Sequence, residues 1–256
     1  MNENIVAIIQ ARMGASRLPG KVLFDLEGKP VLARIIERVR LSRLINKVLV
    51  ATTTNSEDLK IAKLCNEMDI EVFCGSENDV LDRYFQAAQS VNAEHVVRIT
   101  ADCPMIDPLV IDEVICLYLK NKVDYASNIL KETYPDGEDV EVFTFAALKK
   151  VWKSAILPSE REHVTPFIKK NKGLFTQANL EYKENLSSKR WTLDNLEDYE
   201  FIKLIYKNLF YKNNWFGMKD VLDFLNENPE IEKINCHIMR NEGYLNSLRN
   251  DKIIGD

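Results

Sequence analysis

The stretch that decides the fold is Ile5-Val-Ala-Ile-Ile-Gln-Ala-Arg-Met-Gly-Ala-Ser-Arg-Leu-Pro-Gly-Lys21. It begins with a short apolar run rich in β-branched residues, which is typical of a buried strand. The remainder holds two glycines and a proline and therefore predicts a loop. This loop carries Arg12, Arg17 and Lys21 and no carboxylate. A strand that leads into a cationic, glycine-bearing loop is a common arrangement for binding phosphate, because backbone N–H groups and cations can meet on the same oxygens.

The loop does not match either of the common phosphate-loop motifs. The P-loop spacing, G-x-x-x-x-G-K-[ST], is absent, and so is the G-x-G-x-x-G pattern of dinucleotide-binding folds. On charge alone, a phosphate-binding loop and a solvated basic loop are equally good interpretations.

Length and composition narrow the class of protein. The 256 residues suffice for one large α/β domain or two small ones. Apolar residues make up 46% and charged residues 29%, which is ordinary for a globular protein. The net charge of −5 provides no global basic field, so we expect no nucleic-acid partner. The cationic loop is a local feature of an acidic chain, which suits a small phosphorylated ligand.

The cysteines and the apolar segments predict a location. The five cysteines are odd in number and form no C-x-x-C pair, which favours a reducing compartment over a disulfide framework or a zinc site. The first residues, Met1 to Val6, lack the basic and apolar regions of a signal peptide. No apolar run approaches the ~20 residues that span a membrane. We therefore expect a cytoplasmic protein without membrane contact.

The first hundred residues alternate between strand and helix patterns. Strands are predicted at 5–9, 47–51, 71–75 and 95–100, with helices from Pro30, from the 52–58 turn to about 68, and over 76–91. This alternation predicts an α/β fold with a doubly wound, mostly parallel sheet. Ligands of such sheets bind at the carboxyl ends of the strands. The loops expected to converge there are 10–21, 52–58, 75–79 and 101–107, with a base pocket among the first three.

The second half is less regular and shows no clear domain boundary. Short strands are predicted at 124–128, 140–143, 175–182 and 190–193, and helices at 159–170, 196–210 and 218–226. We therefore interpret 1–256 as a single domain, in which about 124–185 is a candidate inserted lid or dimerisation arm.

Two aspartates follow predicted strands. Asp102 comes just after the fourth strand, where a carboxylate beside bound phosphate is a natural Mg²⁺ ligand. Asp194 lies where the predicted strand 190–193 runs into a helix; the alternative for both residues is a helix N-cap. For Asp107, directly before Pro108, the N-cap is the better interpretation.

A second group of polar residues lies in the irregular half. Asp136, Glu138, Asp139 and Glu141 form a charge run that would usually be a solvated turn, although Asp139 and Glu141 share one face if a strand begins there. His163 is either a substrate contact or a packing residue, and we assign no general base. His95 and His237 are interpreted as structural; the role of Arg240 is open, with surface charge as the default interpretation.

These motifs together resemble a known family. The stretches 9–23, 98–108, 134–143, 160–166, 190–199, 228–231 and 240–244 are similar to the sugar-acid cytidylyltransferases, the last two to their C-terminal segment. The resemblance is to the branch named after spore-coat polysaccharide biosynthesis, whose more distant relatives activate 3-deoxy-manno-octulosonate and sialic-type sugars with CTP. The chain departs from the pattern at Ala15, where these loops often carry a small hydroxyl residue that Ser16 could replace.

The resemblance implies a fold, an activity and a site. The fold would be a nucleotide-diphospho-sugar transferase (GT-A-like) architecture. The activity would be transfer of CMP from CTP to a sugar acid or another acidic or phosphorylated acceptor, with release of pyrophosphate, for surface polysaccharide or glycoconjugate synthesis. The expected cofactor is Mg²⁺, and the expected assembly is a homodimer.

The resemblance also assigns residues to roles. The catalytic residues would be Arg12, Lys21 and Asp102, and the metal ligands Asp102 and Asp194. The acceptor would contact Asp139, Glu141 and His163. The nucleotide-binding set is larger and comprises Gln10, Ala11, Arg12, Met13, Gly14, Arg17, Lys21, Thr53, Ser76 and Thr100.

Three alternatives remain at this point. A glycosyltransferase would hold its metal through an Asp-x-Asp pair, but the matching position reads Asp102-Cys-Pro. A non-catalytic nucleotide-binding protein on the same fold would retain the loop without turnover. A nucleotidyltransferase that uses GTP or UTP on a sugar phosphate is equally compatible with the residues.

Overall fold

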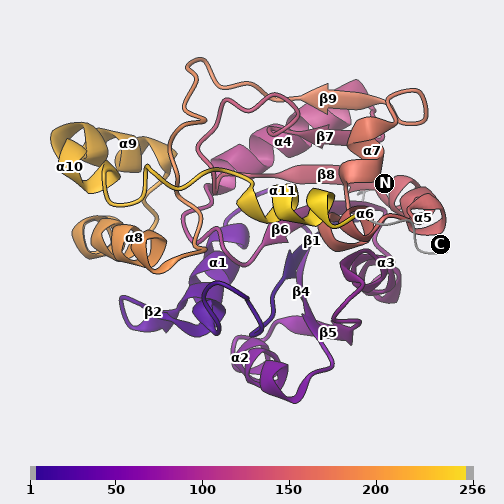
Figure 1. Ribbon diagram of the computed structural model, residues 1–256, viewed down its shortest axis with the longest axis horizontal. Helices are drawn as coiled ribbons and strands as arrows, with labels where there is room; N and C mark the ends of the chain where they lie inside the picture. Colours follow the sequence, from indigo (N-terminus) through magenta and orange to yellow (C-terminus); the bar gives the residue numbers. More distant parts are fainter. Residues whose placement is uncertain (1–3, 252–256) are drawn as a thin grey trace.

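A seven-stranded mixed sheet forms the middle layer of the computed structural model, which describes residues 4–251 (Figure 1). The terminal residues 1–3 and 252–256 lie outside the described part, and they include half of the segment on which the signal-peptide prediction rests. The strands lie in the order β5 (Glu71–Gly75), β4 (Lys47–Thr53), β1 (Ile5–Gln10), β6 (His95–Thr100), β8 (Glu141–Thr144), β7 (Tyr125–Ser127) and β9 (Gln177–Asn179).

The first four strands are parallel, as the sequence predicts. β1 pairs in parallel with both β4 and β6, and β4 pairs in parallel with β5. β8 runs antiparallel to β6 and β7, and β7 is parallel to β9. The carboxyl ends of β1, β4, β5 and β6 therefore meet at one edge, and the stretch 124–185 contributes β7, β8 and β9 to the same sheet.

Helices cover both faces of the sheet, which explains why β1 is an unbroken apolar run. Ala7 and Ile9 belong to the core on one face, whereas Val6 and Ile8 belong to the core on the other. The first face packs against α1 (Val31–Val39), α2 (Leu59–Glu67), α4 (Pro108–Asn121), α8 (Leu196–Leu209) and α9 (Met218–Glu227). The second packs against α3 (Val80–Ser90), α5 (Phe145–Ser154) and α7 (Pro166–Lys170).

The remaining elements are short. They comprise the 3₁₀ turns η1 (Lys21–Leu23) and η2 (Ser56–Asp58), the hairpin β2 (Asp25–Leu26) and β3 (Lys29–Pro30), and the helices α6 (Pro158–His163), α10 (Pro229–Glu232) and α11 (Glu242–Arg249). No helix within 4–251 has the length and apolarity to cross a bilayer. The C-terminal helix α11, which the sequence analysis did not predict, lies beside α6 (Figure 1).

Three predicted elements of the second half are wrong in extent. The predicted helix 159–170 is two helices, because Val164 adopts φ 69° and Pro166 then starts α7 without an N–H to continue the first ladder. The predicted strand 175–182 is ordered as a strand only over 177–179. Residues 190–193 are extended but form only an isolated bridge to Asp136, since their N–H groups bond to loops instead of a neighbouring strand.

The predicted helix 76–91 starts later than the pattern suggests. Asp79 caps α3 by accepting a hydrogen bond from the backbone N of Asp82, and Ser76 in turn accepts one from the backbone N of Asp79. The chain therefore turns between Gly75 and Asp79 at the carboxyl edge of the sheet before the helix begins.

Candidate active site

The cationic loop after β1 is held by its own backbone and by the next loop of the sheet. The backbone N atoms of Ala15 and Gly20 each donate 2.9 Å hydrogen bonds to the carbonyl oxygen of Met13, and Gly20 adopts φ 75°. Asp58 accepts a 2.6 Å bond from the backbone N of Met13. The hydroxyl of Thr53 donates to the other oxygen of Asp58. Thr53 and Asp58 thus hold the cationic loop in place. No motif in the sequence indicated this role of Asp58.

Lys21 joins the cationic loop to the two strand-end aspartates. Its side chain is only 10% exposed, and its Nζ donates to Leu193 O at 2.6 Å, to Asp194 Oδ1 at 2.9 Å and to Asp102 Oδ2 at 3.3 Å. Burial alone would lower the pKa of Lys21, but the two carboxylates raise it above its ordinary value. Lys21 is therefore a permanent cation between Asp102 and Asp194.

The loops that carry the two aspartates are bonded to each other. The backbone N of Leu193 donates a 2.7 Å hydrogen bond to the carbonyl oxygen of Asp102, and the hydroxyl of Thr192 donates to the same oxygen at 3.3 Å. Both carboxylates face one point, where the Lys21 ammonium now lies. Two carboxylates that converge on one cation, with phosphate expected alongside, form a donor set that suits Mg²⁺, which typically takes one or two carboxylates and completes its shell with water and phosphate.

The donor set is limited to these two carboxylates. Among residues 4–251, no group of three or more His, Cys, Asp or Glu side chains surrounds a common point. These two carboxylates are too few to coordinate a metal ion alone, but they suit a metal ion whose other ligands come from a bound nucleotide and water.

A cavity of about 540 Å³ opens directly beside Lys21. It collects most of the residues that the family resemblance assigns to the nucleotide and the metal: Gln10, Ala11, Arg12, Arg17, Lys21, Thr100, Asp102 and Asp194. Met13 and Gly14 lie in the same loop but do not line this cavity. Its other wall is formed by α6 and α11, through Glu162, His163, Asn246 and Ser247.

A second cavity of about 570 Å³ begins at Arg12 and lies over the start of α3. Its lining includes Glu77, Asn78, Asp79, Ile156 and Arg161. This is the side on which the sequence analysis expects the base pocket. Thr53 and Ser76 line neither cavity; both are engaged in bonds that shape the surrounding loops.

A third cavity of about 380 Å³ adjoins the first on the other side of Asp102 and Asp194. The two cavities share Arg17, Thr100, Asp102, His163, Asp194 and Gly243. The third cavity also reaches Asp136, Asp139 and Lys169. The two aspartates that face Lys21 therefore stand at the junction of a larger and a smaller compartment.

Glu141 is buried beside the third cavity and contacts residues that line it. Its side chain is buried and accepts bonds of 2.6 Å from the hydroxyls of Tyr125 and Thr165, with Lys169 at 3.2 Å and Arg98 in direct contact. Burial would raise the pKa of Glu141, but the two cations lower it to about 2. Glu141 does not line the cavity; it holds Lys169 at the cavity wall.

Asp139 lines the third cavity and is paired with an arginine. Arg240 donates a 2.7 Å bond to Asp139 Oδ1 and a 3.1 Å bond to the carbonyl oxygen of Tyr134. The interpretation of Arg240 as surface charge is therefore wrong, since its side chain is 13% exposed and wedged against acids. Burial raises the pKa of Asp139 in spite of that pair. β8 begins only at Glu141, so Asp139 lies in the loop before the strand.

His163 stands between the two compartments that meet at the aspartates. Its Nε2 lies 2.9 Å from the hydroxyl of Ser247, and its ring packs edge-on against Tyr244 at 5.0 Å. Burial lowers the pKa of His163 to about 4, so the imidazole is neutral near pH 7. Both of its partners belong to α11, which the sequence analysis did not recognise as part of the site.

Arg17 ties α11 to the cationic loop. It contacts Asp194 at 3.0 Å and Glu242, the first residue of α11, at 2.7 Å. The stretch Arg240 to Tyr244 resembles the family's C-terminal segment, and that likeness was the only sequence signal that could have placed α11 here.

A mostly parallel sheet with a cationic loop after its first strand, and two carboxylates at the same edge bridged by a lysine of that loop, is the arrangement expected of an α/β nucleotidyltransferase. Comparison with known proteins gives the family. The cytidylyltransferase family model matches residues 6–224. The spore coat polysaccharide biosynthesis protein SpsF of Bacillus subtilis is 31% identical over 236 residues, 90% of this chain and 97% of that protein.

Two further comparisons agree. The 3-deoxy-manno-octulosonate cytidylyltransferase of Geobacter sulfurreducens is 36% identical over 120 residues, 46% of each chain. The solved structure of a cytidylyltransferase from Leptospira borgpetersenii serovar Hardjo-bovis has a TM-score of 0.86 and 33% identity, and the match covers 90% of this chain and 96% of that one. The chain belongs to the cytidylyltransferase family and is a nucleotidyltransferase.

Proposed function

We propose that this chain transfers CMP from CTP to a sugar acid or a related acidic or phosphorylated acceptor, with release of pyrophosphate. The observation that carries the proposal is the Lys21 ammonium, which contacts Asp102 and Asp194 at the junction of two cavities. The Geobacter relative is by its name a cytidylyltransferase for a sugar acid, and the Bacillus relative is named for polysaccharide biosynthesis. These names support the acceptor class and the biosynthetic role.

The nucleotide would occupy the larger cavity. Its triphosphate would lie on Arg12, Arg17 and Lys21, and its base would extend past Arg12 toward the cavity over α3. Lys21 would neutralise the charge that develops on the leaving pyrophosphate. Catalysis of this kind depends mainly on positioning and on fixed charges.

Asp102 and Asp194 would hold the divalent cation, for which Mg²⁺ is our proposal. Bound there, the metal would supply charge neutralisation at phosphate oxygens and lower the pKa of a nearby acceptor oxygen. Thr192 and Leu193 bond to the backbone carbonyl of Asp102, and Lys21 bonds to both carboxylates, so these contacts hold the two side chains close together.

The acceptor would occupy the smaller cavity, with its anionic group toward Lys169 and its hydroxyls toward Asp139. Neutral His163 can donate or accept one hydrogen bond at the boundary between acceptor and nucleotide. In the reaction an acceptor oxygen forms a bond to the α-phosphorus, and the bond between the α-phosphorus and the oxygen bridging to the β-phosphate breaks. The acceptor proton passes to solvent, and pyrophosphate leaves with the bridging oxygen.

A pyrophosphate-release screen tests the proposal. Four nucleoside triphosphates are crossed with octulosonates, nonulosonates, sugar phosphates and phosphonates in the presence of Mg²⁺. We expect release with CTP and an acidic acceptor. Release only with GTP or UTP would overturn CTP as the donor. Tight CTP binding without turnover would favour a non-catalytic role, and consumption of a nucleotide sugar without pyrophosphate would indicate a glycosyltransferase.

The assembly that we propose follows from the family resemblance, and the location follows from the odd number of cysteines without a C-x-x-C pair. We propose a cytoplasmic homodimer. Light scattering coupled to size-exclusion chromatography measures the mass against the 29.5 kDa chain, and a monomeric mass would overturn the dimer.

A further inference from the structure

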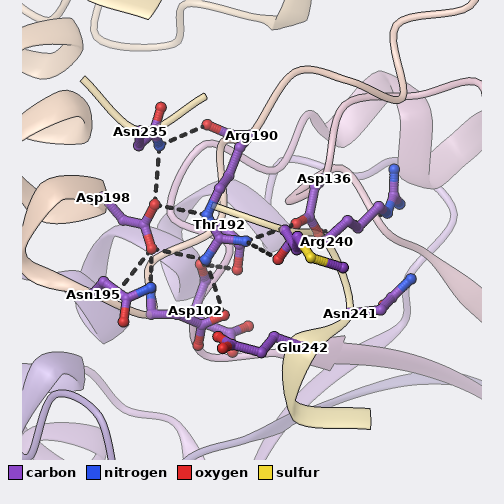
Figure 2. A network of polar contacts seen from close by, with 12 residues as sticks. Asp102, Asp136, Arg190, Thr192, Asn195, Asp198, Asn235, Arg240, Asn241 and Glu242 are labelled. Atoms are coloured by element: carbon purple, nitrogen blue, oxygen red, sulfur yellow. Dashed lines mark hydrogen bonds and ion pairs between the residues drawn. The ribbon is translucent and has the colours of Figure 1, made fainter. Parts of the chain in front are cut away.

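Asp194 is held by more than Lys21. Its Oδ1 accepts from Lys21, whereas its Oδ2 lies 3.0 Å from Arg17 and 3.4 Å from Nη2 of Arg190. Figure 2 shows the Arg190 side chain with its contacts to Asp198 and Asp136. The cationic loop reaches the Asp194 carboxylate from the nucleotide side. Arg190 reaches it from the protein interior, because its side chain is only 4% exposed.

Arg190 uses all of its hydrogen-bond donors inside the protein. Nε and Nη2 donate hydrogen bonds of 2.8 and 2.9 Å to the two oxygens of Asp198, and Nη2 also donates to the Asp194 carboxylate. Nη1 donates to Asp136 Oδ2 at 3.3 Å and to the carbonyl oxygen of Met239 at 3.4 Å. An arginine carries five N–H donors, and these five contacts account for them.

Asp198 fixes the main chain at Asp194. Its Oδ2 accepts 2.9 Å bonds from the backbone N atoms of both Asp194 and Asn195, which closes the start of α8. Its Oδ1 also accepts from Asn235 at 3.0 Å, and its side chain is fully buried. The Arg190–Asp198 pair therefore determines where the backbone of Asp194 lies and which way one of its oxygens points.

We propose that Arg190 is a positioning residue for catalysis, acting together with Asp198 to aim the carboxylate of Asp194 at the divalent cation. The inference rests on the proposed function, because it needs Asp194 as a metal ligand. It assigns to Arg190 no contact with substrate, because Arg190 lines neither of the two cavities that meet at the aspartates nor the cavity over α3.

The alternative is a buried ion pair that only stabilises the fold. A purely structural pair would need only the Arg190–Asp198 fork. The additional contacts to Asp194 and Asp136 bring the same guanidinium to one residue at the metal site and to another in the acceptor cavity. Residues that orient metal ligands typically change metal affinity about 10- to 100-fold when they are replaced, whereas a structural pair changes stability alone.

The test measures binding of Mn²⁺, followed by electron paramagnetic resonance, in the presence of a CTP analogue with a methylene bridge between its α- and β-phosphates. Arg190→Lys keeps the charge but cannot form the planar fork. We expect its Mn²⁺ Kd to rise about tenfold, while its affinity for the analogue in EDTA stays within about twofold of the parent. Asp198→Asn, which keeps the shape of the side chain, should act in the same direction.

Lys189→Ala is the matched control. It removes a neighbouring cation and its 2.5 Å pair with Glu232 without touching Asp194 or Asp198. Its Mn²⁺ Kd should equal that of the parent. The dependence of turnover on Mg²⁺ should move to higher concentration in the Arg190 and Asp198 variants and not in the control.

The outcomes separate the two proposals. If the parent binds Mn²⁺ with the analogue and both variants bind it equally well, Arg190 is only structural and the positioning role is lost, whatever the melting temperatures. If neither variant folds, the pair is likewise a structural element and the assignment fails. If the parent itself binds no Mn²⁺ beside the analogue, the proposed function fails and this inference fails with it.

Discussion

The backbone N of Leu193 donates a 2.7 Å hydrogen bond to the carbonyl oxygen of Asp102. This main-chain bond joins the residue before Asp194 to Asp102 itself, in the loop after β6. The two carboxylates lie close together because the backbones of their loops are bonded to each other. The ion pairs of both carboxylates with Lys21 add to this backbone contact.

Asp102→Asn should abolish most of the activity. The amide keeps the size of the side chain but removes the negative charge with which, in our proposal, Asp102 binds the divalent cation, so we expect kcat to fall at least about 100-fold at saturating Mg²⁺. Steady-state pyrophosphate release measures it. Asp223→Asn, which breaks an exposed pair with Lys219, is the control and should be unchanged. A near-normal kcat for Asp102→Asn would remove Asp102 from the catalytic site.

Lys21→Met should lower kcat/KM about 10²- to 10³-fold, because it removes the buried cation that we propose binds the triphosphate. It also leaves two carboxylates facing each other, so the variant should gain more melting temperature from added Mg²⁺ than the parent does. Differential scanning fluorimetry with and without Mg²⁺ measures this gain. Lys29→Met, whose side chain is half-exposed and pairs with Glu37, is the control. Equal gains in variant and parent would show that Mg²⁺ does not bind between the carboxylates.

Gly137→Ala should destabilise the fold. Gly137 adopts φ 110°, and an added Cβ would lie 2.7 Å from the carbonyl carbon of Trp191 and 2.8 Å from the backbone N of Thr192. The loop of Asp136 could then no longer pack on the segment that carries Asp194. We expect a loss of about 3 kcal/mol or more in the free energy of unfolding by urea denaturation.

Two other glycines separate the causes of that loss. Gly28→Ala has a positive φ of 81° but open space around it, so it should cost only about 1 kcal/mol. Gly173 also has open space around it, and its φ is not positive, so Gly173→Ala should leave the free energy of unfolding unchanged. If Gly137→Ala costs no more than Gly28→Ala, the close approach to Trp191 is unimportant.

Glu242→Gln should improve CTP binding. Glu242 contacts Arg17 at 2.7 Å, so its carboxylate would compete for that guanidinium with the triphosphate that we propose Arg17 binds. We expect the KM for CTP to fall about two- to fivefold, in the range of a partly exposed ion pair worth up to ~1 kcal/mol. Glu227→Gln, an exposed residue near the end of α9, is the control. An unchanged or higher KM would show that Glu242 does not oppose nucleotide binding.

Glu141 should contribute a pH-dependent part of the stability. Its pKa is lowered from 4.5 to about 2 by Lys169 and Arg98 against the effect of burial. A carboxyl whose folded pKa is depressed stabilises the fold fully above its unfolded pKa, and this contribution is lost as the pH falls from about 4.5 to about 2. The shift corresponds to about 3 kcal/mol.

The measurement is the free energy of unfolding of the parent and of Glu141→Gln as a function of pH. The parent should be more stable at pH 7, and the difference should shrink below pH 4.5. A difference that is constant down to pH 2.5 would contradict the depressed pKa of Glu141.

The first half of the fold could be predicted because its signals are local. Each of the four parallel strands is a short apolar run between polar turns, and a sheet buried on both faces needs such runs. The second half could not, because its course depends on contacts distant in sequence. Residues 190–193 resemble a strand but bond to the loops of Asp102 and Asp136, and the helix predicted over 159–170 breaks where Val164 takes a positive φ.

Residue type and spacing suffice to predict the four parallel strands, the cationic loop and the two aspartates as a family motif. They do not reveal that Lys21 is buried between those aspartates, that Arg240 and Arg190 face acids, or that α11 lies beside His163. The physical reason is that a charge acquires its role from the partners that folding places within a few ångströms of it, and no local pattern encodes those partners.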